Sequence, residues 1–98
     1  MPSAPQAPVL SARDDISPVG VLTVWNTVKS ATSYTIRVVG LRLGTELTLS
    51  SVVPSYIIPS EAVGGYELVR VEVVAVNSAG YGPASEPSVE RTPPISMW

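Results

Sequence analysis

The stretch from Val69 to Pro87, which reads V-R-V-E-V-V-A-V-N-S-A-G-Y-G-P-A-S-E-P, decides the fold class of this chain. Its first part alternates apolar residues with others as far as Asn77, which is the period of a β-strand with one face in a core. A turn rich in glycine follows, and the pattern then predicts a short polar strand from Ala84 to Arg91. This arrangement is typical of two neighbouring antiparallel strands.

Five further short strands are expected before this stretch, each bounded by turn-forming residues. They cover residues 9–12, 19–26, 34–39, 46–52 and 56–58. In the second of them the inward face stays open, because Leu22, Val24 and Trp25 cannot share one side of a regular strand. Residues 60–65 form a loop with room for one helical turn. Seven short strands without a long helical period predict an all-β fold, a seven-stranded antiparallel β-sandwich, with an eight-stranded barrel as the weaker alternative.

Composition narrows the function classes. The chain has 98 residues, enough for one domain, and its net charge of -2 gives no attraction to nucleic acid. It contains no Cys and no His, which removes disulfides, thiol nucleophiles, imidazole bases and the usual zinc ligands, and no cofactor is expected. No apolar run approaches the ~20 residues of a membrane span. Charged residues make up only 14% of the chain against a usual ~25%, which favours a surface partly covered by other protein subunits.

The two ends are expected to differ from the domain between them. Prolines make residues 1–6 an extended arm or linker, residues 7–93 form the domain, and residues 94–98 are an apolar tail. The first residues lack the basic and apolar regions of a secretory signal, so a native Met1 implies synthesis in the cytosol without export by that route.

With these strands in place, residues 7–94 resemble a fibronectin type III domain, a relative of the immunoglobulin-like sandwiches. Trp25 stands nine residues before Tyr34, like the tryptophan and tyrosine on the second and third strands of that family. The pattern V-x-V-x-V-x-A-x-N from Val69 to Asn77, followed by S-A-G-Y-G-P-A-S-E-P, is similar to the family's last two strands and the turn between them. The resemblance implies a sandwich that acts by binding other proteins.

Two positions depart from the family pattern. Val69 stands where the family often has a tyrosine whose hydroxyl pins the preceding corner; either Tyr66 replaces it from a shifted loop, or the corner is absent. The turn between the last two expected strands also lacks the Arg-Gly-Asp tripeptide through which some members bind integrins.

Polar residues offer little chemistry. Asp14 and Asp15 are adjacent acids, for which a solvated turn is a far more common outcome than a calcium site. Glu67 and Glu72 have opposite strand parity and are expected on opposite faces, where they cannot work as an acid–base pair. Lys29 beside Ser30 is expected in a solvated loop, not as a desolvated nucleophile pair. We therefore expect no enzyme, no catalytic residue and no metal site.

Apolar residues on the outside are the more useful signal. If the odd-numbered residues from Val69 face the core, then Val74 and Val76 face outward, next to Val39 and a possible Arg37–Glu72 pair. Together with Tyr81 in the turn, these valines form a candidate protein-binding face. Scattered surface valine is the ordinary alternative. The second candidate is the tail, whose Ile95, Met97 and Trp98 dock into a neighbouring subunit, fold back on their own domain, or belong to a truncated linker.

The sequence thus predicts a non-enzymatic structural or protein-interaction module. Low charge, the missing signal and the apolar ends favour a small component of a larger assembly, such as a decoration or tail protein of a phage virion, with possible homo-oligomers or a lattice. The alternative is one domain from a longer extracellular or cell-surface protein, with an adhesion, spacer or carbohydrate-enzyme accessory role. Neither setting involves nucleic acid or a membrane as partner.

Overall fold

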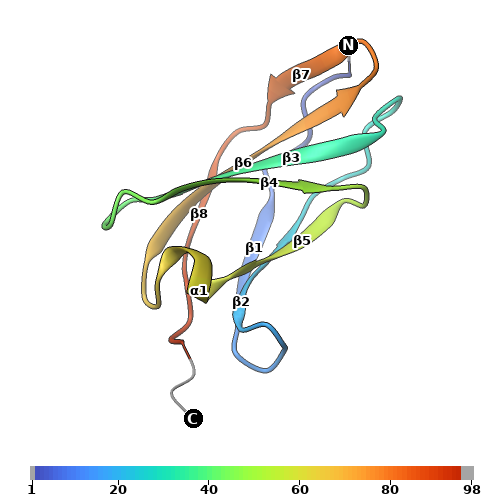
Figure 1. Ribbon diagram of the computed structural model, residues 1–98. Helices are drawn as coiled ribbons and strands as arrows, with labels where there is room; N and C mark the ends of the chain where they lie inside the picture. Colours follow the sequence, from blue (N-terminus) through green and yellow to red (C-terminus); the bar gives the residue numbers. More distant parts are fainter. Residues whose placement is uncertain (1, 96–98) are drawn as a thin grey trace.

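Two antiparallel sheets pack face to face in the computed structural model, which describes residues 2–95 (Figure 1). In chain order the elements are β1 (Val9–Arg13), β2 (Gly20–Val24), β3 (Ser33–Gly40), β4 (Glu46–Ser51), β5 (Ser55–Pro59), α1 (Ser60–Val63), β6 (Leu68–Asn77), β7 (Gly80–Ala84) and β8 (Ser88–Arg91). One sheet has the order β1-β2-β5, and the other has the order β4-β3-β6-β7, with β8 also paired to β6. The predicted sandwich is confirmed, as is the single helical turn after β5.

The end of the chain differs from the prediction, because β7 (Gly80–Ala84) takes in residues expected to form the glycine-rich turn. A break separates β7 from β8 (Ser88–Arg91), and only β8 and Ala84 fall within the strand expected from Ala84 to Arg91. Ser85 lies at the break. Its backbone N–H donates to the Val73 carbonyl at 2.8 Å, and its side-chain Oγ accepts the Val73 N–H at 2.9 Å. A side-chain oxygen thus replaces a backbone carbonyl in the ladder, and the pairing with β6 shifts its register between Val74 and Val76. The described part of the chain therefore has eight strands instead of seven.

The core follows the predicted alternation on β3 and β6. Its members are at most 6% exposed and come from both sheets, from the loop after β2 and from α1. They are Val21, Trp25, Val28, Tyr34, Ile36, Val38, Ile58, Val63, Val69, Val71, Val73 and Ala75. Leu47 and Leu49 of β4 are only partly buried, and they pack against the margin of this cluster.

The open question about β2 is answered by burial. Val21, Thr23 and Trp25 point inward, while Val24 on the other face is 40% exposed. The Trp25 ring meets Tyr34 edge to face, with ring centroids 5.4 Å apart. The Tyr34 hydroxyl in turn accepts the Val28 N–H at 3.0 Å and fixes the loop that follows β2.

Both ends of the described chain are packed on the sandwich. Pro2, Pro5 and Pro8 are buried, and a β-carbon placed on Gly82 of β7 would lie only 2.1 Å from the Pro2 carbonyl oxygen. The arm therefore runs in close contact with the second sheet, beside β7 (Figure 1). At the other end Ile95 is half-buried near the loop that precedes β6.

Candidate protein-interaction surface

The outer face of β3 and β6 carries the predicted ion pair. Arg37 and Glu72 are direct cross-strand partners, and 4.0 Å separates Arg37 Nη1 from Glu72 Oε1. Both side chains are partly solvated, so the pair contributes little to stability and mainly gives this face one charge of each sign. The expectation that Glu67 and Glu72 lie apart also holds, since Glu67 is fully buried near the loop after β3.

The expected exposure of Val74 is wrong. Val74 lies between Thr35 of β3 and Ala84 of β7 in the ladder, on the face opposite the core cluster. Its side chain is nevertheless 0% exposed. Strand parity gave its direction correctly, but parity does not tell how far the rest of the chain covers a residue. Val74 therefore provides packing and no contact surface.

What remains of the predicted face is smaller. Val39 and Val76 are half-buried, and Tyr81, which is opposite Val76 in the pairing of β6 with β7, is 61% exposed. The structure thus brings Val76 and Tyr81 together at one end of the sheet. Val39 pairs with Arg70 near the other end of β3, so it belongs to a different part of this face.

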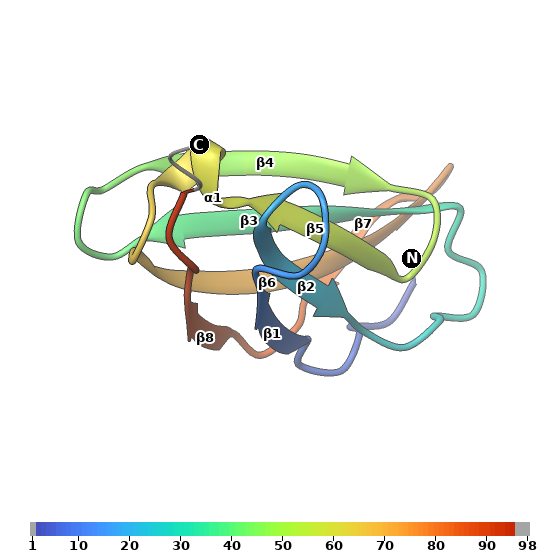
Figure 2. The same cartoon turned by 90° about the horizontal axis from the view of Figure 1, so that it is seen from below.

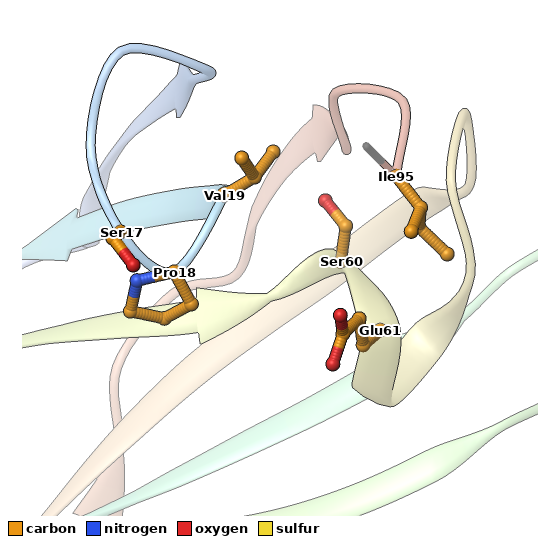
Figure 3. Close-up of a pocket in the computed structure, with 6 residues that line it drawn as sticks. All are labelled: Ser17, Pro18, Val19, Ser60, Glu61 and Ile95. Atoms are coloured by element: carbon orange, nitrogen blue, oxygen red, sulfur yellow. The ribbon is translucent and has the colours of Figure 1, made fainter. Parts of the chain in front are cut away.

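Of the three tail residues predicted to make contacts, only Ile95 lies within the described chain; Met97 and Trp98 fall outside it. Ile95 lines a hollow of about 250 Å³ together with Pro18, Val19 and the start of α1 (Figure 3). The Ser60 hydroxyl beside it donates to the Pro93 carbonyl at 3.0 Å, and Glu61 points to solvent. The beginning of the tail therefore folds back on its own domain, and the hollow offers no assembled set of reactive groups.

A buried carboxylate fixes the corner between β3 and β4. Glu67 is 0% exposed, and its side-chain oxygens accept the backbone N–H groups of Arg42 at 3.1 Å, Leu43 at 2.6 Å and Leu68 at 2.8 Å. Burial acts to raise the pKa of Glu67, but these three donors and the charge of Arg42 outweigh it, so its pKa lies below the ordinary value. The carboxylate is thus a fixed structural anion.

This anchor also answers the question about the missing corner tyrosine. Tyr66 is 61% exposed, and it is its backbone carbonyl that accepts a hydrogen bond, from Arg91 Nη1 at 2.8 Å. Glu67, one residue later, holds the neighbouring loop by its carboxylate. Nothing in the sequence pattern distinguished this glutamate from a solvated one, because two of its three donors are backbone groups 24 and 25 residues away.

A second group of exposed apolar residues was missed by the sequence analysis. Of nine large apolar side chains exposed in the described chain, four flank β4 at its two ends. Leu41 and Leu43 are 51% and 59% exposed before the strand, and Val52 and Val53 are 78% and 53% exposed after it. The sequence did contain a signal for these four residues. They are apolar but lie in turns, which normally hold polar residues.

The remaining polar residues form no reactive cluster. Within residues 2–95 no three acidic side chains gather to hold a metal ion. The Arg13 guanidinium donates two hydrogen bonds to the Asp15 carboxylate, each 2.9 Å long. These bonds lower the pKa of Asp15. Lys29 and Ser30 are both exposed. None of the helical segments in the described range is long and apolar enough to span a bilayer.

The arrangement defines an antiparallel β-sandwich of two sheets. Among solved structures, the chain is similar to the FN5 domain of Drosophila Lar, with 18% identity and a TM-score of 0.75 over 95% of this chain and 98% of that chain. It is also similar to the sixth fibronectin type III domain of human fibronectin type III domain containing protein 3, with 23% identity and a TM-score of 0.72 over 100% and 92% of the two chains. A multidomain structure from titin matches with 22% identity and a TM-score of 0.75, covering 98% of this chain and 33% of that one.

These likenesses show the fold: the chain has the fibronectin type III fold that its sequence resembles. Neither a scan against protein-family models nor a search of curated proteins returns a match to this sequence.

Proposed function

We propose that this chain is a non-enzymatic module that acts through contacts with other protein subunits. The observation that carries the proposal is the concentration of exposed apolar side chains at a few places on a weakly charged surface. The first is the pair of turns that flank β4, the second is the cross-strand pair of Val9 and Val24 on β1 and β2, and the third is Tyr81 beside the half-buried Val76. Exposed apolar residues gathered in this way are typical of contact surfaces, whereas single scattered ones are ordinary.

The setting we propose is a small structural subunit of a larger assembly, of the kind found in virions. The low fraction of charged residues supports it, because a surface covered by neighbours has less need of charge for solubility.

A second setting is one module of a longer extracellular or cell-surface protein. It is favoured by a specific observation, namely that structural neighbours such as the titin domains are parts of longer chains. What those proteins do does not extend to this one at 22% identity.

The experiment is a measurement of native mass by light scattering on the full chain, repeated for a double variant, Val76→Thr with Tyr81→Ser. If the assembly forms through this end of the sheet, the parent has a mass above the monomer and the double variant loses it. If the double variant still forms the oligomer, the contact lies elsewhere on the chain. If the parent is a monomer at every concentration, the result favours a module of a longer extracellular or cell-surface protein.

A further inference from the structure

The two sheets have edges of very different kinds. A strand at a sheet edge presents unpaired N–H and C=O groups to other strands, and proteins usually block such edges with proline, bulges or covering segments. The edge strand β5 is short, follows Pro54 and ends at Pro59. The opposite edge of the same sheet is β1. It lies beside β8, where the Ser88 hydroxyl donates to the Pro8 carbonyl at 2.5 Å. Both edges of this sheet are therefore protected.

In the second sheet one edge is protected and the other is open. The β7–β8 edge is interrupted at Ser85, contains Pro83 and Pro87, and has Pro2 of the arm against Gly82. The β4 edge has none of these features. It runs from Glu46 to Ser51 without proline or bulge, pairs in regular register with β3, and lies along the margin of the molecule (Figure 2).

The register of β4 tells which backbone groups are free. Gly40 donates its N–H to the Thr45 carbonyl at 2.7 Å, and its own carbonyl accepts the Gly44 N–H at 2.8 Å, so Gly40 occupies a hydrogen-bonded position of the ladder. In an antiparallel ladder, hydrogen-bonded and non-bonded pairs alternate, so residues 47, 49 and 51 also bond to β3. The N–H and C=O groups of Glu46, Thr48 and Ser50 therefore point away from β3, toward the open edge.

This free edge is complementary to itself. When a second β4 runs antiparallel with Thr48 opposite Thr48 of the other copy, Glu46 lies opposite Ser50 of that copy. The three bonded pairs then exchange about six backbone hydrogen bonds. Each Glu46 faces a neutral serine, so no like charges meet. On the inner face Leu47 comes opposite Leu49 of the other copy, and these partly buried leucines extend the core across the junction.

The exposed apolar turns match in the same register. Because the two strands run in opposite directions, Leu43 in one copy lies at the level of Val52 and Val53 in the other, while Leu41 lies farther from the junction, where its backbone N–H donates to the Leu68 carbonyl. Each of these side chains is at least half exposed in the single chain. The pairing thus brings apolar residues together at both ends of the strand. The free backbone groups, the charges and the exposed apolar residues all fit a second copy of the chain, so a second copy is the partner expected at the β4 edge.

We propose that two copies of this chain associate through their β4 edges, antiparallel and centred on Thr48, to form one continuous sheet across the dimer. The proposal rests on the proposed function as a protein-contact module, and it names the partner and the site. An interface of one strand pair with two small apolar ends is at the low end of the size range, so the dissociation constant is expected to be micromolar or weaker.

The test is sedimentation velocity on the full chain from about 1 µM to about 1 mM, a range that brackets such a constant. The parent is expected to pass from monomer to dimer with concentration. Thr48→Pro removes an N–H at the centre of the free edge and none that β3 uses, so the variant is expected to fold and to stay monomeric. Its circular dichroism and thermal unfolding verify the fold, and Thr48→Ala, which keeps the N–H, is the matched control that still dimerises.

A second pair of variants tests the register with opposite signs. Ser50→Glu places a carboxylate opposite Glu46 of the other copy twice per dimer and is expected to weaken association about 3- to 10-fold. Ser50→Lys places an ammonium there and is expected to strengthen it by about the same factor. Both effects are expected to shrink at high salt. A general loss of stability cannot produce two opposite changes.

Three outcomes would overturn the inference: a monomer throughout the range, a dimer that Thr48→Pro leaves intact, or Ser50 variants that shift association in the same direction. The variant pair of Val76 and Tyr81 separates this from the broader proposal. If that pair abolishes association and Thr48→Pro does not, the β4 inference fails while the function as a protein-contact module stands.

Discussion

The Oε2 atom of Glu67 accepts the backbone N–H of Leu43 at 2.6 Å, across 24 residues of chain. This bond joins the start of β6 to the turn that leads into β4, and the N–H of Arg42 adds a second one at 3.1 Å. A β-carbon on Gly40 would lie 2.7 Å from the same carboxylate oxygen, so residue 40 has to be small for the carboxylate to reach the turn. The exposed leucines of that turn are therefore held in place from the buried side.

Glu67→Gln is predicted to destabilise the fold in a manner that depends on pH. The pKa of Glu67 is lowered in the folded state, so the folded chain binds fewer protons than the unfolded chain near the ordinary value of about 4.3. The carboxylate's contribution is thus present above about pH 4.3 and is lost as pH falls through the lower folded pKa. The glutamine variant has no such proton to bind.

Urea unfolding of the parent and of Glu67→Gln at pH 7, 5, 4 and 3 measures this difference. At pH 7 the variant is expected to be less stable, because one amide oxygen replaces a charged acceptor of three N–H groups. The gap is expected to narrow below about pH 4. A gap that stays constant over the whole range would contradict the assignment of Glu67 as an ionised anchor. Glu72→Gln, at the partly solvated ion pair, is the control and should change little.

Val74→Asp is predicted to be far more harmful than Val76→Asp, although both valines have the same strand parity. Val74 is 0% exposed, so the new carboxylate loses its hydration without a partner, at a cost of at least about 3 kcal/mol. Val76 is only half-buried, and its substitution should cost about 1 kcal/mol or less. Chemical unfolding at pH 7 compares the two. Equal costs would mean that Val74 is accessible to water.

Tyr34→Phe is predicted to cost about 1–3 kcal/mol, because it leaves the buried Val28 N–H without its acceptor. The phenyl ring keeps the edge-to-face contact with Trp25, so the loss is confined to the hydroxyl. Tyr81→Phe is the matched control on an exposed ring and should stay within about 0.5 kcal/mol. The comparison needs only thermal or urea unfolding of three proteins. A neutral Tyr34→Phe would show that water reaches the Val28 amide.

Much of the fold was predictable because period-2 patterns are local. The inward sets on β3 and β6 followed from spacing, and the Arg37–Glu72 pair followed from spacing and the family topology. What failed depends on distant segments: the full burial of Val74, the Ser85 side chain in the ladder, and the backbone donors from another turn that bond to Glu67. On β2, several apolar residues point each way, so its inward face required the structure.

The same distinction applies to the contact surface. The sequence placed candidates on a sheet face by parity, and only Val76 and Tyr81 stay together there at the surface. Whether a strand lies at an edge is a property of topology, so the open side of β4 and the apolar turns that flank it became visible only when the strand order was known.

Gly82→Ala is predicted to displace the N-terminal arm and to lower stability by about 1–3 kcal/mol, the usual cost of overpacking. A β-carbon at this position would lie 2.1 Å from the Pro2 carbonyl oxygen, and backbone atoms cannot yield as a flexible side chain does.

The destabilisation caused by Gly82→Ala should therefore depend on whether the N-terminal arm is present. In a chain that lacks residues 1–4, the same substitution is expected to be nearly neutral, so a double-mutant cycle measured by urea unfolding gives a coupling of the size of the overpacking cost. Proteolysis of the full-length variant should cut the arm faster than in the parent. If the substitution costs the same with and without residues 1–4, its effect arises in β7 itself, and the contact with Pro2 does not constrain the arm.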